Sequence, residues 1–342
     1  METTAAQRCN TCQRTLVMMP GSQYETCPMR HAVNLFNQRF KGPVLFRIGQ
    51  FINAAANHYQ PTRDIPRQPS SYGRKRAVLC GITYYGHRKK LDASVHNVRS
   101  MHHLLINKLG FPNASILVLT EEESDRSRIP TKRNMQAALQ WLVRGCQPGD
   151  SLFVYYAGHA CKVPDEDGDE IDGYDGALCP VDYKVAGLIL DDEINATIVA
   201  PLPHGVTLHS VGDTCFSGTL LDLPFLCRIN WDGLYRWEEH QLTYKGTRGG
   251  KAVCISACAD DQLSADTSAF TGQPIGALTF SFIQTIQNEN KLTYGRLLSS
   301  MRKKVYQAQQ VIGRYVPLAS SVMEPQLSSS ARFEIYSEPV IF

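Results

Sequence analysis

The sequence contains no long hydrophobic run, and this absence excludes proteins that span a membrane. No apolar stretch reaches the roughly 20 residues that a helix needs to cross a bilayer. Residues 1–7 have neither the basic start nor the apolar stretch of a secretory signal peptide. The net charge of +3 is too small to favour binding to nucleic acid. We therefore expect neither a membrane partner nor a nucleic-acid partner.

The chain also lacks the pattern of a disulfide framework. Its eleven cysteines are odd in number and scattered, which is typical of free thiols in a reducing compartment. We therefore expect a protein of the cytoplasm or the nucleus. A length of 342 residues predicts one large domain with an appendage, or two domains.

From about residue 75 onward, apolar segments typical of strands alternate with amphipathic segments typical of helices. The predicted strands cover 77–82, 115–119, 150–157, 205–211, 252–256 and 333–336, and the predicted helices cover 95–109, 278–286, 294–312 and a segment that Thr131 caps. Residues 228–250, rich in aromatic and charged side chains, are predicted to form an exposed loop. The alternation predicts an α/β sandwich around a mainly parallel sheet.

Two of the predicted strands run into residues that can carry chemistry. The segment 150–157 is followed by Gly158 and His159, and the segment 205–211 leads to Asp213 and Cys215. The carboxyl ends of parallel strands meet at one edge of a sheet, where ligands bind. We expect His159 and Cys215 to face each other there as a base and a thiol nucleophile. The alternative is that Cys215 is a buried small hydrophobic residue.

The segments around these two residues resemble the catalytic boxes of the metacaspases, relatives of the caspases. The boxes read Ala157-Gly158-His159 and Asp213-Thr214-Cys215-Phe216-Ser217-Gly218, and the resemblance covers roughly residues 76–342. Further segments resemble the plant-type (type I) branch, namely 168–175, 179–182, 190–195, 221–226 and 264–268. The resemblance implies a caspase-like α/β/α sandwich around a six-stranded type of sheet. It also implies a large-subunit-like part to about 230 and a small-subunit-like part from about 250.

The resemblance implies a cysteine endopeptidase with Cys215 as nucleophile and His159 as general acid and base, and no third residue is evident. The backbone N–H groups of Cys215 and Ala160 would hold the oxyanion. Ala160 and Phe216 depart from the family, which usually has Gly and His at these positions. These departures leave open an alternative, a weakly active or inactive pseudo-peptidase that acts as a regulatory scaffold. The expected setting is programmed cell death or a stress response, with a zymogen that processes itself.

Metacaspases cleave after Arg or Lys, and the resemblance implies that Asp213 supplies the acid of the substrate pocket. Ser94 and Asn97 stand where the family has Cys and a second acid, and the resemblance alone places Asp260 or Asp261 near the pocket, with Asp261 as the expected residue. A guanidinium could bridge Asp213 and the carbonyl of Asn97. We expect peptide substrates with a basic residue before the scissile bond (P1). Restoring the acid with Asn97→Asp should raise kcat/KM, more for Lys than for Arg.

The acidic run 165–175 is not an EF-hand, because Glu170 and Gly176 stand where that loop needs Gly and Glu. The resemblance instead implies a calcium site built from separate carboxylates, Asp175, Asp191, Asp192 and Asp222. Several hard oxygen ligands suit calcium better than magnesium. The alternative is a solvated acidic loop. Bound calcium would activate the protein by ordering the loops around Cys215, and Lys245 and Arg248 are expected positions of self-cleavage.

Residues 1–35 contain the residue types of a zinc site, with Cys9, Cys12, Cys27 and His31 as the expected ligands. The segment resembles the small zinc fingers that precede some plant metacaspases. It departs at the fourth ligand, because Arg30 stands where the family has its last Cys. The alternatives are a degenerate finger or a disordered tail. We expect a linker over 36–74, a peptidase domain over 75–342, signalling partners that bind the N-terminal segment, and a monomer.

Overall fold

The structure, a computed structural model, describes residues 74–342 apart from 167, 169, 215–219, 240, 243, 259–274 and 314–323. Nearer the N-terminus it describes four short strands, β1 (Ala6–Arg8), β2 (Thr15–Val17), β3 (Tyr24–Thr26) and β4 (Val33–Leu35). Strand β1 pairs antiparallel with β2, and β3 pairs antiparallel with β4. Within the described part of the chain, every helix is too short or too polar to cross a membrane.

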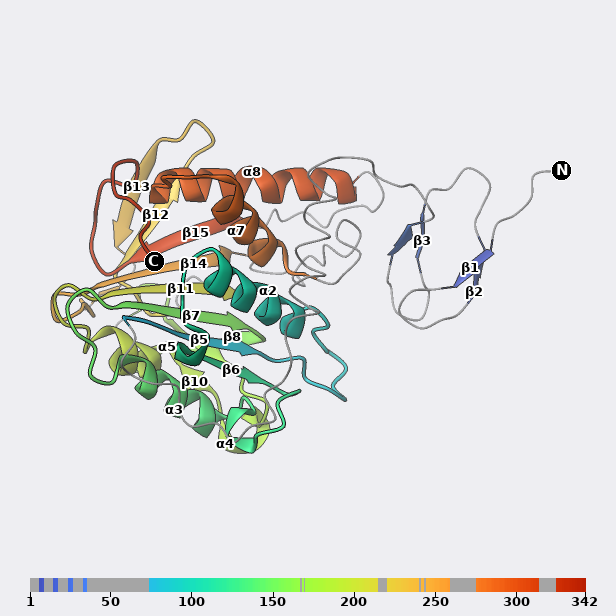
Figure 1. Cartoon of the computed structure of the whole chain (residues 1–342), viewed down its shortest axis with the longest axis horizontal. Helices are drawn as coiled ribbons and strands as arrows, with labels where there is room; N and C mark the ends of the chain where they lie inside the picture. Colours follow the sequence, from blue (N-terminus) through green and yellow to red (C-terminus); the bar gives the residue numbers. More distant parts are fainter. Residues whose placement is uncertain are drawn as a thin grey trace.

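One eight-stranded sheet forms the centre of the domain that begins at residue 74 (Figure 1). Its strands are β5 (Lys75–Gly81), β6 (Ile116–Thr120), β7 (Ser151–Ala157), β11 (Thr207–Asp213), β12 (Phe225–Ile229), β13 (Tyr235–Glu239), β14 (Lys251–Cys258) and β15 (Glu324–Ser329). The strand order is β13-β12-β15-β14-β11-β7-β5-β6. The strands from β14 to β6 pair in parallel, whereas β15, β12 and β13 pair antiparallel. The predicted mainly parallel sheet is confirmed.

Helices cover both faces of this sheet (Figure 1). One layer contains α2 (Ser94–Asn107), α7 (Ala277–Asn288) and α8 (Tyr294–Gly313), and the other contains α3 (Lys132–Val143), α4 (Tyr183–Ala186), α5 (Asp191–Ile194) and the π-helix η3 (Asn195–Val199). Along β7, Phe153 and Tyr155 pack into the first layer, and Leu152 and Val154 pack into the second. A parallel strand buried on both faces is a continuous apolar run. The predicted α/β/α sandwich is confirmed.

A second, smaller sheet lies next to the strand ends that carry the predicted catalytic residues. It has the order β10-β9-β8, with β8 (Ala160–Pro164), β9 (Tyr174–Leu178) and β10 (Ile189–Leu190), and all its pairings are antiparallel. Strand β8 follows His159 directly, and β10 runs into α5. Two short 3-10 helices, η1 (Asn113–Ser115) and η2 (Arg126–Arg128), complete the described elements.

The predicted exposed loop over 228–250 is wrong for its first part, because β12 and β13 form a hairpin there. The pairing runs from Phe225 opposite Glu239 to Ile229 opposite Tyr235. The hairpin lies at the edge of the sheet, where an exposed ion pair joins Arg228 to Glu238. Polar side chains on an edge strand are common because they block further pairing, and they give the strand the composition of a loop. The hairpin extends the expected six strands to eight.

The predicted closing strand over 333–336 is also wrong. Residues 333 and 334 are irregular, residues 335–337 form a turn, and Phe333 and Ile335 pack in the core of the first layer. The closing strand is β15, whose sequence Glu-Pro-Gln-Leu-Ser-Ser is mostly polar but buried. Its serines find partners within the sheet: Ser329 Oγ donates to the carbonyl of Ala252 at 3.3 Å, and Ser330 Oγ, one residue on, accepts the Ala252 N–H.

Candidate active site

The carboxyl ends of β7 and β11 lie beside each other in register, because Ala157 and Asp213 are paired positions of the two strands. His159 follows Ala157 by two residues, and Cys215 follows Asp213 by two residues. Cys215 itself lies outside the described residues. This register is what the expected meeting of His159 and Cys215 requires, because strands β7 and β11 end at paired positions of the sheet.

His159 is held by two segments of the loop that follows β5. Its Nε2 lies 2.6 Å from the carbonyl oxygen of Lys89, and its backbone N–H donates to the hydroxyl of Tyr84 at 2.9 Å. The ring centroids of His159 and Tyr84 are 4.6 Å apart. A carbonyl oxygen only accepts, so Nε2 carries the ring proton and Nδ1 keeps a lone pair. This tautomer suits a base that takes a proton at Nδ1.

The Lys89 carbonyl is a functional group that sequence reasoning missed. No third residue is evident from the sequence, and every residue carries a carbonyl, so no motif could reveal this one. Ala160, where the family usually has Gly, is an ordinary residue of β8: it pairs with Leu178 of β9, and its φ is not positive. Alanine in place of glycine therefore introduces no left-handed backbone strain.

Asp213 is a buried carboxylate at the end of β11. Its Oδ2 accepts a hydrogen bond from Thr279 Oγ1 at 2.5 Å and another from Asn97 Nδ2 at 3.2 Å. Its Oδ1 has no hydrogen-bond partner among the residues that the structure describes. Burial raises the pKa of Asp213 above its usual range, although the hydrogen bonds from Thr279 oppose this shift. Thr279, on α7, has no signal in the sequence that links it to this site.

Asn97 joins three parts of the chain next to Asp213. It lies on α2, donates to Asp213 on β11, and accepts the N–H of Gly276 at 2.9 Å through Oδ1. A Cβ on Gly276 would collide with the Asp213 carboxylate, so the close approach requires glycine. Ser94 is buried at the start of α2, and its carbonyl oxygen would lie 2.8 Å from a Cβ on Gly81. Asp261 lies outside the described residues.

Three of the four predicted calcium ligands lie together. Asp175 on β9 and Asp191 and Asp192 at the start of α5 each offer a carboxylate oxygen within 4.8 Å of the other two. Asp191 also accepts the N–H of Gly176 at 2.9 Å, which ties α5 to β9. A group of carboxylate oxygens is the donor set that calcium prefers. These residues therefore fit a calcium ion.

Asp222, the fourth predicted ligand, is connected to this cluster through a lysine. The Nζ of Lys245 lies 3.1 Å from Asp222 Oδ2 and also forms an ion pair with Asp192. The Asp222 side chain is 1% exposed, and Asn195 Nδ2 donates to its backbone carbonyl at 2.7 Å. Burial raises the pKa of Asp222, and the positive charge of Lys245 opposes the shift.

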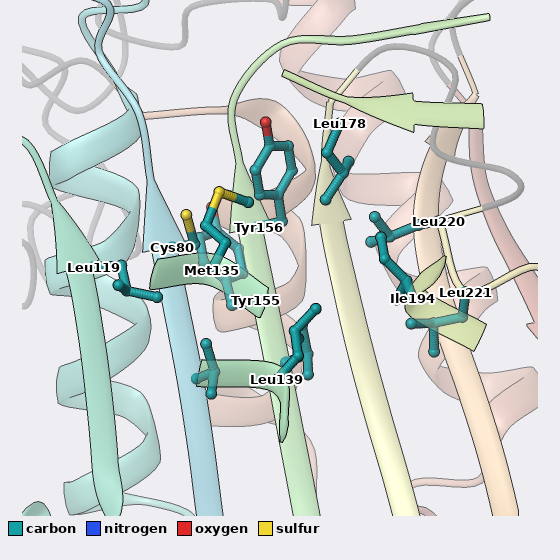
Figure 2. A pocket seen from close by; sticks show the side chains of 12 residues that line it. Cys80, Leu119, Met135, Leu139, Tyr155, Tyr156, Leu178, Ile194, Leu220 and Leu221 are labelled. Atoms are coloured by element: carbon teal, nitrogen blue, oxygen red, sulfur yellow. The ribbon is translucent and has the colours of Figure 1, made fainter. Parts of the chain in front are cut away.

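An apolar cavity of about 30 Å³ lies between the sheet and α3 (Figure 2). Leu220 and Leu221 line one side of it beside Ile194 of α5, and Met135 and Leu139 of α3 line another. Leu220 and Leu221 directly follow the segment 215–219. Helix α5, which begins with Asp191 and Asp192, and the segment that follows the predicted nucleophile therefore line the same apolar cavity.

The predicted zinc ligands, Cys9, Cys12, Cys27 and His31, lie outside the described residues. In the sequence, Cys9 and Cys12 fall between β1 and β2, and Cys27 and His31 fall between β3 and β4.

Comparisons with known proteins all point to the same family. The model of the metacaspase peptidase C14 domain matches residues 75–224. Metacaspase-1 of Arabidopsis thaliana is 44% identical over 352 residues, which cover 97% of this chain and 95% of the relative. Metacaspase-3 of the same plant is 48% identical, covering 79% of this chain and 76% of the relative, and Metacaspase-2 is 40% identical, covering 79% and 73%. The chain belongs to the metacaspase family and is a cysteine-type endopeptidase.

Proposed function

We propose that this endopeptidase cleaves after Arg or Lys, with Cys215 as nucleophile and His159 as general acid and base. The observation that carries the specificity is the buried carboxylate of Asp213, whose Oδ1 has no partner among the described residues. A buried carboxylate stabilises a cation far more than a neutral side chain. In this proposal, the side chain bound to Asp213, two residues before Cys215, belongs to P1, the residue whose carbonyl is attacked.

In the proposed reaction, Nδ1 of His159 takes the thiol proton of Cys215, and the thiolate attacks the carbonyl carbon of the scissile bond. The backbone N–H groups of Cys215 and Ala160 donate to the oxyanion. His159 then protonates the leaving amine, and water hydrolyses the acyl-enzyme. The Lys89 carbonyl accepts a hydrogen bond from the Nε2–H group of His159 throughout the reaction, so it stabilises the imidazolium that forms.

The test uses fluorogenic peptides that differ only at P1, with Arg, Lys, Gln or Asp there. Asp213→Asn should lower kcat/KM for the Arg and Lys peptides roughly 30-fold or more, equivalent to about 2 kcal/mol. The Gln peptide should change little, because it carries no charge. Cys215→Ala and His159→Ala should each abolish cleavage. An unchanged preference in Asp213→Asn would place the specificity pocket elsewhere.

We also propose that calcium activates the enzyme at the cluster of Asp175, Asp191, Asp192 and Asp222. The bound ion would supply the positive charge that offsets repulsion among these carboxylates. Asp222 lies on the same segment as Cys215, and Leu221 lines the same apolar cavity as Ile194 of α5. Drawing Asp222 toward α5 would therefore order the chain that carries the nucleophile. Turnover of the Arg peptide with and without calcium tests this, and no turnover in either condition would favour the pseudo-peptidase alternative.

A further inference from the structure

We propose that Glu121 is a positioning residue for His159 and acts through the loop 82–91 between β5 and α2. The inference rests on the proposed role of His159 as the general acid and base. Glu121 directly follows β6, one of the two edge strands of the sheet. It belongs to neither catalytic box.

The carboxylate of Glu121 accepts hydrogen bonds from three successive backbone N–H groups. The distances are 2.5 Å from Thr83 and 2.8 Å from Tyr84, both to Oε2, and 3.1 Å from Tyr85 to Oε1. Successive N–H groups that converge on one anion form a strong, charge-assisted site. Tyr84 has a φ of +57°, which a residue with a side chain rarely adopts. Glu121 therefore holds this loop in an otherwise unfavourable backbone conformation.

The loop that Glu121 holds makes two kinds of contact with His159. Tyr84 lies against the imidazole ring, accepts the His159 N–H, and donates its hydroxyl to the carbonyl of Cys179 at 2.6 Å. Lys89 presents the carbonyl that accepts the proton of Nε2. The N–H of Leu91 donates to the carbonyl of Thr83 at 2.9 Å and closes the loop. Releasing the Glu121 end would therefore loosen both the ring contact and the carbonyl contact.

The neighbouring residue Glu122 provides a matched control. It pairs with Arg99 at 2.5 Å and accepts the hydroxyl of Tyr85 at 2.8 Å. These contacts are with exposed or half-buried side chains and do not hold the backbone of the loop. Glu122→Gln removes the same charge from the same strand end, so it controls for a general effect of charge.

The experiment compares Glu121→Gln, Glu121→Ala and Glu122→Gln with the wild type. We expect Glu121→Gln to lower kcat at least ten-fold with KM changed less than three-fold, and Glu122→Gln to leave both within two-fold. The pH dependence of Cys215 alkylation by iodoacetamide gives a second readout. In Glu121→Gln the midpoint of the alkylation rate against pH should move toward about 8.5, the pKa of an ordinary thiol.

Folding is checked separately by thermal denaturation, and Glu121→Gln serves if Glu121→Ala does not fold. A folded Glu121→Gln protein with wild-type kcat and alkylation profile would overturn the proposal. His159→Ala in the same assays distinguishes the two levels of inference. If His159→Ala stays active, the proposed function fails. If His159→Ala is inactive while Glu121→Gln behaves like the wild type, only the role of Glu121 fails.

A different observation carries a second inference, which rests on the proposed calcium site. We infer that Lys245 occupies the acidic cluster as an internal cation that calcium displaces. Its Nζ pairs with Asp222 and Asp192, two of the four predicted ligands. A carboxylate oxygen that contacts this ammonium cannot also coordinate calcium without bringing two cations together. The divalent ion carries the larger charge and accepts more oxygens, so it should replace the lysine.

Calorimetry on the Cys215→Ala protein, which cannot cleave itself, tests this displacement. Lys245→Met should tighten calcium binding at least ten-fold, because the competitor is gone. The matched control is Lys132→Met: Lys132 pairs at 3.2 Å with Glu193, the residue after Asp192, but does not contact the cluster. It should change the affinity less than three-fold. Equal or weaker calcium binding by Lys245→Met would overturn the inference.

Limited trypsin digestion of the Cys215→Ala protein gives a readout of the lysine itself. Trypsin needs a free lysine side chain, so calcium should accelerate cleavage after Lys245, as followed by mass spectrometry of the peptide that ends there. Cleavage after the exposed Lys184 should not change. Protection of Lys245 by calcium would overturn the inference, and calorimetry without any calcium binding would remove the proposed site itself.

Discussion

Asn97 donates its side-chain Nδ2 to Oδ2 of Asp213 at 3.2 Å and so joins the first turn of α2 to the last residue of β11. Its Oδ1 accepts the N–H of Gly276, which sets the orientation of the amide. The carbonyl that the sequence suggested as a partner for a guanidinium is therefore turned toward a backbone amide. Asn97 supplies Asp213 with a hydrogen-bond donor that stabilises its carboxylate.

Replacing Asn97 by aspartate should make the peptidase strongly dependent on pH. Two facing carboxylates share a proton until the pH rises above the raised pKa of the pair. We expect kcat/KM of Asn97→Asp for basic peptides to rise between pH 6 and 9 more steeply than that of the wild type. At the upper end, the gain for Lys peptides should exceed that for Arg peptides, at roughly ten-fold for about 1.4 kcal/mol. A profile parallel to the wild type would contradict this prediction, and Asn97→Ala controls for loss of the donor.

Asp175→Asn should weaken calcium binding about ten-fold or more, because one charged oxygen of the cluster is lost. Calorimetry on the Cys215→Ala background measures the affinity. Asp172→Asn is the control: Asp172 belongs to the same acidic run but pairs with Lys162 of β8, and both side chains are exposed. If both variants weaken binding equally, the run acts by its overall charge and not through a defined site.

We predict about one equivalent of zinc in the purified full chain, bound by Cys9, Cys12, Cys27 and His31. Elemental analysis of the wild type and of Cys12→Ser measures this, and the variant should lose the metal. His31→Ala tests the unusual fourth position. A full chain that retains well under one equivalent would indicate a degenerate finger.

His209 should make the fold less stable in mild acid. It is buried on β11, and its Nε2 lies 2.8 Å from the hydroxyl of Tyr294. Burial, and to a smaller extent the positive charge of Lys251, lowers the pKa of His209 to about 3. The unfolded chain takes up this proton near pH 6.5, whereas the folded chain does not until near pH 3. Stability is therefore lost progressively as the pH falls below 6.5.

Between pH 7.5 and 5.5 this single group should lower the free energy of unfolding by about 1.4 kcal/mol. Urea unfolding of the wild type and of His209→Gln measures the difference in pH dependence. The exposed His204 provides the control, because His204→Gln should leave that dependence unchanged. Equal slopes for wild type and His209→Gln would contradict the prediction.

Local sequence signals were sufficient for the elements that carry the site. Strand β7 is Ser151–Ala157, within one residue of its prediction, because burial on both faces produces an uninterrupted apolar run. The side chain of Thr131 accepts the N–H of Asn134 at 3.3 Å, as its predicted capping role requires. The strand β15 and the β12–β13 hairpin were missed, because their polar residues are stabilised by partners far away in the sequence.

The sequence by itself determined which chemistry lies at the strand ends and in the acidic cluster, since the residue types and their order along the chain are properties of the sequence. Only the tertiary structure decided which groups oppose these residues: the Lys89 carbonyl opposite His159, Thr279 opposite Asp213, and Lys245 opposite Asp222. A backbone carbonyl, a threonine and a lysine are too common to mark themselves as partners. Their positions depend on the paths of loops and helices, which long-range hydrogen bonds set when the chain folds.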